Sequence, residues 1–268
     1  MNLGKILNYI KIQILTVKNP FFIKKFKNQN VKNNYNFFEK NGFLDLGKIF
    51  SDEDCLKINQ KIDMMIQSHQ ARFLENQNIW KIEKCDKFVN EIEKAISDDV
   101  LSIIQNYFKK KIFISDFDIR RVLPTSYEEV LKFGSSNSDW HKDTRGRQIK
   151  MMIYLTPVTA TDSYFSLLPG TQKKNTLNFK KSRFKENDIL KDNEIRFLGD
   201  DKGRALIFDT NITHRLNRNS KSNIRDTMTI NFTPGQYLKN IYHGKLDKIS
   251  SKRLRELLTN DNLIEKRS

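Results

Sequence analysis

The sequence predicts a mainly β protein with flanking helices, in which short strands close into a double-stranded β-helix, a cupin-like jelly-roll barrel. Two observations support this fold class. Short apolar or alternating segments, bounded by turn residues, follow one another through the second half of the chain, and no internal repeat is visible. The segments expected as strands are residues 112–123, 151–157, 163–168, 203–208 and 225–233.

Apolar residues at helical spacing are concentrated before these strands. After an expected strand and turn at 36–50, residues 52–70 form a helix whose apolar face consists of Ile58, Ile62, Met65 and Ile66. A second helical region covers 88–110, and a last short helix lies near 250–258. We expect the helices of the N-terminal half to pack on one outer face of the barrel.

Length and composition fit one large β domain with helical additions, or at most two small domains. The chain has 268 residues, of which 38% are hydrophobic and 30% charged, and its mean hydropathy of −0.63 is typical of a soluble protein. The two cysteines, Cys55 and Cys85, match no metal-binding spacing. They indicate a reducing compartment, so we expect a cytoplasmic protein. Cys55 is expected to pack within the first long helix.

The pattern divides the chain into a basic amphipathic segment at 1–35, the barrel with its N-terminal helices at 36–245, and a helical tail at 246–268. No run of about 20 apolar residues exists, which excludes a transmembrane span. The first segment also lacks the small-residue cleavage site of a secretory signal. It therefore either lies on an anionic membrane surface, at the inner face of a membrane, or covers the outside of the barrel.

The net charge of +16 favours phosphate-bearing or other anionic partners. The basic residues are spread along the chain and interleaved with asparagine, and no helix-turn-helix, zinc-finger or ribonucleoprotein motif is found. We therefore expect no specific nucleic acid partner. A genomic bias towards lysine and asparagine would explain the same charge without any ligand.

Two motifs carry the chemistry: His141-Lys-Asp143 and, far downstream, His214 between Thr213 and Arg215. One carboxylate and two imidazoles are the ligand set of a mononuclear non-haem iron centre, in which the remaining positions stay open for a co-substrate and O₂. Residues i and i+2 of an extended segment project to the same side, so His141 and Asp143 can share one ion. His214 must then come from another strand.

The other two histidines of the chain, His69 and His243, lack such a context and are interpreted as surface or packing residues. The strand expected at 225–233 adds a cation near the metal. Its alternation divides the side chains between two faces, one of which carries Arg225, Thr227, Thr229 and Asn231. An arginine there can hold the remote carboxylate of a dicarboxylic co-substrate through two parallel hydrogen bonds.

With these motifs, residues 36–235 resemble the phytanoyl-CoA dioxygenase branch of the Fe(II)/2-oxoglutarate-dependent oxygenases. The resemblance depends on the following segments: 37–44, 50–55, 140–143, 153–158, 168–173, 203–209 and Arg225. The sequence departs from the family pattern in two places. Residues 162–165 replace the usual Gly-Pro pair, and residues 171–200 are longer and more basic than expected.

The resemblance implies that His141, Asp143 and His214 bind Fe(II), that 2-oxoglutarate and O₂ are co-substrates, and that Arg225 pairs with the far carboxylate of 2-oxoglutarate. Thr227 would add a hydroxyl group to this carboxylate site. The implied reaction is hydroxylation of a C–H bond of a small molecule, with release of succinate and CO₂. Asp143 favours hydroxylation because related halogenases leave that ligand position empty for chloride.

Two further residues have alternative roles. Tyr154 either reaches the co-substrate or lines the barrel as an ordinary aromatic residue. Arg121 stands near the place where the family often has a basic residue facing the co-substrate, and its alternative is the protein surface. Trp140 is expected to wedge the ligand strand in place rather than to contact substrate.

The basic insertion at 171–200 is either a lid that meets an anionic group of the substrate or a solvated loop. Two other classes of function remain open besides the oxygenase. The first is a non-catalytic, cupin-like metal-binding protein, and the second is a peripheral membrane or polyanion-binding protein whose oxygenase fold is secondary.

Overall fold

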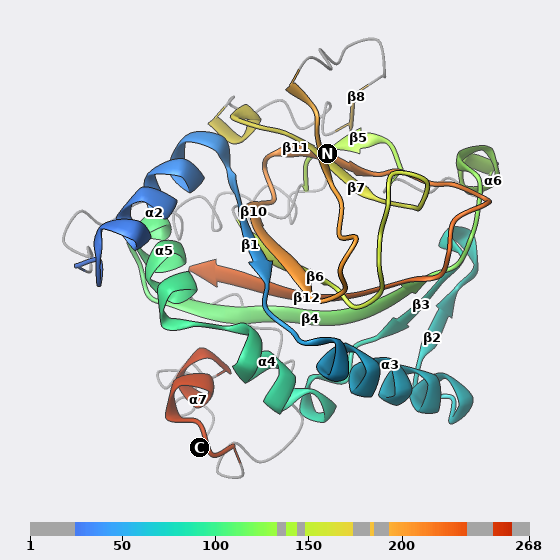
Figure 1. Ribbon diagram of the computed structural model, residues 1–268, viewed down its shortest axis with the longest axis horizontal. Coiled ribbons are helices and arrows are strands. Elements are labelled where there is room, and N and C mark those ends of the chain that lie inside the picture. The colour runs from blue at the N-terminus through green and yellow to red at the C-terminus, as the bar shows by residue number, and fades with distance from the viewer. Residues whose placement is uncertain are drawn as a thin grey trace, which may run out of the picture.

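In the computed structural model, two antiparallel sheets face each other, and helices cover the outer face of the larger sheet (Figure 1). The structure describes residues 25–132, 138–143, 148–173, 183–184, 193–234 and 249–258. This is the mainly β, helix-flanked jelly-roll barrel that the sequence predicts.

The larger sheet has seven strands, in the order β1 (Phe43–Lys48), β10 (Arg204–Asp209), β6 (Ile149–Tyr154), β12 (Arg225–Pro234), β4 (Ile112–Val122), β3 (Ile79–Ile82) and β2 (Arg72–Leu74). The smaller sheet has five, in the order β8 (Arg183–Phe184), β5 (Trp140–His141), β11 (Thr213–Leu216), β7 (Phe165–Leu168) and β9 (Ile195–Phe197). Apart from β2, β3 and β4, which are consecutive, neighbouring strands in both sheets are not consecutive in the sequence, and such crossovers are typical of a jelly roll.

The helices of the described residues are α2 (Gln29–Asn41), α3 (Asp52–Gln67), α4 (Val89–Ala95), α5 (Asp98–Phe108), α6 (Tyr127–Lys132) and α7 (Lys252–Leu258). Short 3-10 turns occupy Glu75–Gln77, Cys85–Lys87 and Thr171–Lys173. Figure 1 shows α3, α4 and α7 on the side of the large sheet that faces away from the small one, and α2 and α5 at the left end of the large sheet, beside β1. Buried residues of all five helices share one apolar core with the large sheet. The prediction that N-terminal helices cover one outer face is therefore confirmed.

The first long helix begins with a capping box, because the Ser51 hydroxyl accepts from the Asp54 amide and the Asp54 carboxylate accepts from the Ser51 amide. Its buried face contains Cys55 and three of the four apolar residues expected there, and the fourth, Ile66, is partly buried against the same core. Cys55 is fully buried, as expected.

One strand expectation and one helix expectation need correction. The segment expected as a strand and turn at 36–50 opens with the end of α2, which starts after the Asn28 cap and stops at Gly42 in a left-handed conformation; only Phe43–Lys48 is a strand. The helical region expected at 88–110 is two helices, because Ser97 caps a new one by accepting from the Val100 amide.

The alternation of β12 separates two environments. Its even-numbered apolar side chains, from Met228 to Phe232, belong to the core beneath the helices. The odd-numbered residues face the small sheet, and Thr227, Thr229 and Asn231 lie opposite Tyr154, Met152 and Lys150 of β6. Strands β4, β6, β7, β10 and β12 and helix α7 all fall within one to three residues of the expected segments.

Some expectations fall on residues that the structure does not describe. Residues 1–24 of the basic amphipathic segment, most of the insertion at 171–200, and the tail after residue 258 lie outside the described residues. In the part of the chain that is described, no helix has the length and apolar character needed to cross a membrane. The membrane contact of residues 1–35 stays a prediction.

Gly203 lies just before β10, and its backbone is hydrogen-bonded to residues at the ends of β6 and β1. Its amide donates to the Tyr154 carbonyl (2.6 Å), and its own carbonyl accepts from the Ile49 amide (2.9 Å). The backbone has φ +89°, and a Cβ atom at this position would collide with the carbonyl of Phe50. Gly47 also has a positive φ, +68°, but has open space around it. Substitution of the two glycines therefore distinguishes the cost of a left-handed backbone from the cost of a steric collision.

We predict that Gly47→Ala lowers the free energy of unfolding by about 1–2 kcal/mol, the usual cost of a left-handed non-glycine residue. Gly203→Ala should lower it by about 3 kcal/mol or more, because the collision with backbone adds to the strain. Urea unfolding of both variants measures the difference. Equal losses would show that β1 and β10 can move apart at Gly203.

Candidate metal centre

The described residues contain one cluster of side chains able to hold a metal ion: His141, Asp143 and His214. β5 and β11 are neighbours in the small sheet, and the register pairs His141 directly with His214. Asp143 follows β5 and is fixed by its amide, which donates to the Thr210 carbonyl (3.0 Å). Lys142 lies between the two ligands, and its side chain points to the other side of the extended segment, where it donates to the Thr171 carbonyl (2.6 Å).

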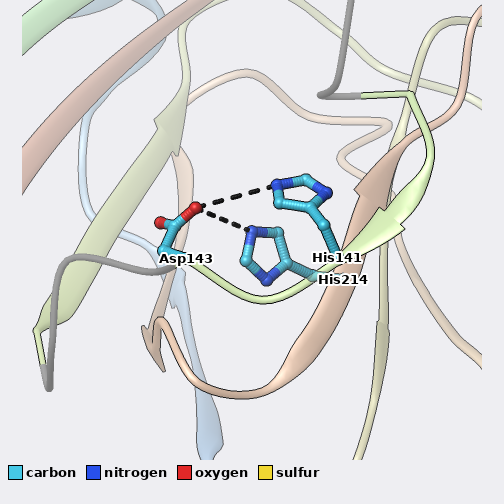
Figure 2. Close-up of side chains that lie close together, drawn as sticks. All are labelled: His141, Asp143 and His214. Atoms are coloured by element: carbon cyan, nitrogen blue, oxygen red, sulfur yellow. Dashed lines mark ion pairs between the residues drawn. The ribbon is translucent and has the colours of Figure 1, made fainter. Parts of the chain in front are cut away.

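The three side chains converge on one point (Figure 2). The Nε2 atoms of His141 and His214 lie 3.7 and 3.9 Å from Oδ1 of Asp143, and the three ligand atoms are all within 4.8 Å of one another. An ion bonded to each at about 2.0–2.2 Å fits between atoms at this separation. The sequence prediction that these residues share a site is therefore consistent with the geometry.

Backbone carbonyl groups fix the orientation and the tautomer of both imidazoles, with Nε2 free to bind a metal. Nδ1 of His141 lies 2.7 Å from the Asp139 carbonyl oxygen, and Nδ1 of His214 lies 2.8 Å from that of Ile212. A carbonyl only accepts hydrogen bonds, so each Nδ1 carries the proton and each Nε2 presents its lone pair. In both cases, Nε2 is the atom that faces Asp143.

Burial and charge keep the ligands in the protonation states that a metal requires. Burial, with the neighbouring imidazole, lowers the pKa of His214 to about 3, and burial also lowers the pKa of His141. Burial alone would raise the pKa of Asp143, but Lys150 and the two imidazoles outweigh it and hold the pKa below its usual range. Two neutral imidazoles and one carboxylate are a donor set that suits Fe(II).

Lys150 is a neighbour of the centre that the sequence interpretation missed. Its Nζ lies 2.5 Å from Oδ2 of Asp143, so the other oxygen, Oδ1, is the one that faces the two histidines. The signal was present in the sequence. Lys150 lies one residue before the strand expected at 151–157 and has the same parity as Met152 and Tyr154, which face the small sheet.

A cavity of about 320 Å³ extends from the centre across the inner face of the large sheet. This volume is in the range of small-molecule sites. Its walls include the two histidines, Asp143 and the odd-numbered residues of β12: Arg225, Thr227, Thr229 and Asn231. The face that the sequence analysis assigned to these four residues therefore lines the cavity.

Arg225 lies in this cavity with unused hydrogen-bonding capacity. It is 4% exposed, and its Nη1 donates to the Ser163 carbonyl (2.9 Å), while Nε has no hydrogen-bond partner among the described residues. Burial lowers its pKa, and the Arg120 guanidinium adds repulsion. Burial and repulsion from Arg225 and Arg120 also lower the pKa of Arg218, to about 9. A buried group of like charges calls for an anion.

Tyr154 and Thr227 flank Arg225. The Tyr154 hydroxyl donates to the Phe197 carbonyl (2.9 Å) and accepts from the Phe165 amide (3.1 Å), while the Arg225 guanidinium lies 5.9 Å from its ring. These contacts fit the alternative in which Tyr154 is a barrel-lining aromatic residue. Thr227 lines the cavity, and its hydroxyl lies 3.4 Å from the Arg120 carbonyl, which is a long hydrogen bond.

The structure does not bring Arg121 to the cavity. Its guanidinium binds both carboxylate oxygens of Asp226 (2.9 and 2.8 Å) and also Asp63 of α3, on the helix-covered side of the sheet. Arg120, the preceding residue, lines the cavity instead. The expectation that Arg121 faces the co-substrate is therefore wrong, and its neighbour Arg120 faces the cavity. The reason is the register, since Arg120 pairs with Thr227 on the cavity face of β12 and Arg121 pairs with Asp226 on the opposite face.

Trp140 is 1% exposed, and the Arg215 guanidinium lies 4.5 Å from its ring, which fits the expected wedge beside the ligand strand. His69 is exposed in the turn after α3, away from the cavity, and His243 lies outside the described residues.

Comparison with known proteins identifies the fold. No family model matches the chain, and no curated protein matches it. Among solved structures, the chain is similar to SnoN, a non-haem α-ketoglutarate-dependent epimerase from nogalamycin biosynthesis, with a TM-score of 0.58 and 7% identity over 76% of this chain and 83% of SnoN. It is also similar to SnoK, a carbocyclase of the same biosynthesis, with a TM-score of 0.54 and 11% identity over 75% and 83%.

A third similar structure is HygX from Streptomyces hygroscopicus with nickel and 2-oxoglutarate bound, with a TM-score of 0.56 and 11% identity over 78% of this chain and 89% of HygX. At these identities, the likeness establishes the fold. The chain has the jelly-roll fold of 2-oxoglutarate-dependent non-haem iron enzymes.

We predict that His214→Ala weakens Co(II) binding, as a spectroscopic substitute for Fe(II), by at least about a hundredfold, because one of three ligands is lost. Absorption titration of the metal-free protein measures the affinity. His69→Ala removes an exposed imidazole and should leave the affinity unchanged. Equal affinities of the wild type and His214→Ala would place the ion elsewhere.

Proposed function

We propose that the protein is an Fe(II)- and 2-oxoglutarate-dependent oxygenase, related to the phytanoyl-CoA dioxygenase branch, that hydroxylates a C–H bond of a small molecule and releases succinate and CO₂. The observation that carries this proposal is one cavity holding both a His-Asp-His cluster and a buried arginine whose Nε has no hydrogen-bond partner among the described residues. Either feature alone would fit many proteins. Together they match a metal ion and a dicarboxylate that bind side by side.

The residues of the chain have separable roles in this proposal. His141, Asp143 and His214 hold the ion, and Lys150 orients Asp143 through its second oxygen. Arg225 receives the far carboxylate of 2-oxoglutarate, with Thr227 beside it and the Tyr154 ring behind it. Bound Fe(II) would supply the activation of O₂ that is coupled to decarboxylation of 2-oxoglutarate.

The buried surroundings of the site support the same assignment. Arg225 and Arg218 repel each other in a buried place, and Arg120, although it is paired with Asp118, adds to this repulsion. A dianionic co-substrate would compensate this repulsion. The choice of hydroxylation is supported by Asp143, which completes a three-residue ligand set.

We predict that the purified protein forms succinate from 2-oxoglutarate only when Fe(II) and O₂ are present, at a slow rate without its own substrate. His141→Ala should abolish this reaction and His69→Ala should not. Quantification of succinate by mass spectrometry measures it. A protein that binds the metal tightly but forms no succinate under any condition would be the non-catalytic metal-binding alternative.

Arg225→Ala should raise the KM for 2-oxoglutarate by tens-fold to thousands-fold, which corresponds to about 2–5 kcal/mol for loss of a shielded charge partner. Arg225→Lys should rescue poorly, because an ammonium group lacks the planar fork of two donors. Arg253→Ala, at a partly exposed ion pair with Asp98, is the control. An unchanged KM in Arg225→Ala, with a normal melting temperature, would move the carboxylate site away from Arg225.

A further inference from the structure

The end of the cavity remote from Arg225 contains a second polar site. Asn231 lies six positions after Arg225 on the same face of β12, which separates the two side chains by about 20 Å of strand. Asn231 pairs in register with Lys150, whose ammonium binds the ligand carboxylate of Asp143. This end of the cavity therefore adjoins the metal centre through Lys150.

Asp116 is the register partner of Asn231 across β4 and β12, and both side chains line the cavity. Oδ1 of Asp116 accepts only the amide of the next residue, Phe117 (3.0 Å). Among the described residues, no lysine, arginine or histidine forms an ion pair with Asp116. A carboxylate that is partly withdrawn from water without a cation is unfavourable, so its surroundings suit a positively charged ligand.

The other charges along this wall are already paired. Arg120 binds Asp118 through two hydrogen bonds (3.0 and 2.9 Å), and Lys81 lies 2.7 Å from Glu83 and 3.6 Å from Asp118. Lys150 is engaged with Asp143. Burial and the nearby charge of Asp118 raise the pKa of Asp116, in spite of an opposing effect of Lys81. The positive charge of a bound cation would offset both effects.

Asn231 provides an independent sign of a ligand. The residue is 4% exposed, and its side-chain Oδ1 is buried with no hydrogen-bond partner among the described residues. A buried acceptor without a donor costs about 1–3 kcal/mol, so such atoms are normally satisfied. A ligand carrying several N–H donors could satisfy the Asn231 amide oxygen and the Asp116 carboxylate together.

We propose that Asp116 and Asn231 form the substrate-recognition end of the cavity and that they bind a protonated amino group of the substrate. This inference rests on the proposed function, since it takes the Arg225 end as the place of 2-oxoglutarate. An ammonium group offers three donors and one positive charge, which match one unpaired carboxylate and one unpaired amide oxygen. The substrate class is therefore a small molecule with an amine held close to the metal centre.

The test uses three probes with one carbon skeleton: benzylamine, benzyl alcohol and benzoate. Ligand-detected NMR titration of the full-length protein measures their affinities, first without metal and then with Fe(II) and 2-oxoglutarate under argon. Benzylamine should bind at least about tenfold more tightly than the other two, because a charge-assisted hydrogen bond contributes more than a neutral one. Asp116→Asn should remove this preference and Asn231→Leu should weaken it.

Asp52→Asn is the matched control, since it removes an exposed carboxylate outside the cavity and should keep the preference. The melting temperature separates recognition from a structural role. Asp116→Asn should melt at the same or a higher temperature, because it removes an unpaired charge. A lower melting temperature, a wild type that does not prefer benzylamine, or an Asp116→Asn variant that retains the preference would overturn the inference.

Two measurements, the benzylamine affinity of the metal-free protein and the formation of succinate, distinguish this inference from the proposed function. Benzylamine preference in the metal-free protein depends on Asp116 and not on Fe(II) or 2-oxoglutarate. A preference lost in Asp116→Asn, in a protein that forms no succinate, would support the amine site and refute the oxygenase. Succinate formation without any amine preference would do the opposite.

Discussion

The structure depends on one constraint: the seven-stranded sheet has an apolar face under the helices and a polar face toward the cavity. β12 is paired on both sides, by β4 and β6, and is buried along its whole length. Its apolar side chains meet the helices, while Arg225 and the polar residues after it face the cavity. A register slip of one residue would exchange these faces and place a guanidinium in the helix-covered core. The core under the helices and the polarity of the cavity are therefore set by one register.

The sequence alone identified the features that depend on local pattern. The strands with long alternation, the α3 face, and the His141, Asp143 and His214 set could be predicted because periodicity and spacing are visible along the chain. Features that depend on pairing could not. β5 and β11 are two and four residues long, and only their mutual register makes His141 and His214 neighbours. Arg120 and Arg121 differ only in parity, which the pairing of β4 with β12 decides.

The net charge of +16 does not describe the cavity, because the charged groups at its two ends differ in sign and in pairing. At one end, the guanidinium groups of Arg225 and Arg218 are buried and repel each other, and burial and repulsion lower the pKa of both. Near Asp116, the cations are paired with protein carboxylates and one acidic group remains. The two ends therefore favour ligands of opposite charge.

The metal cluster is organised by the backbone and not by the ion. Each histidine places its Nδ1 against the carbonyl of the residue two positions earlier, Asp139 for His141 and Ile212 for His214, so the same local device orients both rings. Asp143 is fixed through its amide by Thr210 and through its carboxylate by Lys150. Ligands held in this way need little rearrangement when a metal binds. The large apolar core between the helices and the seven-stranded sheet gives the fold a source of stability other than a bound ion, in contrast to small metal-dependent domains.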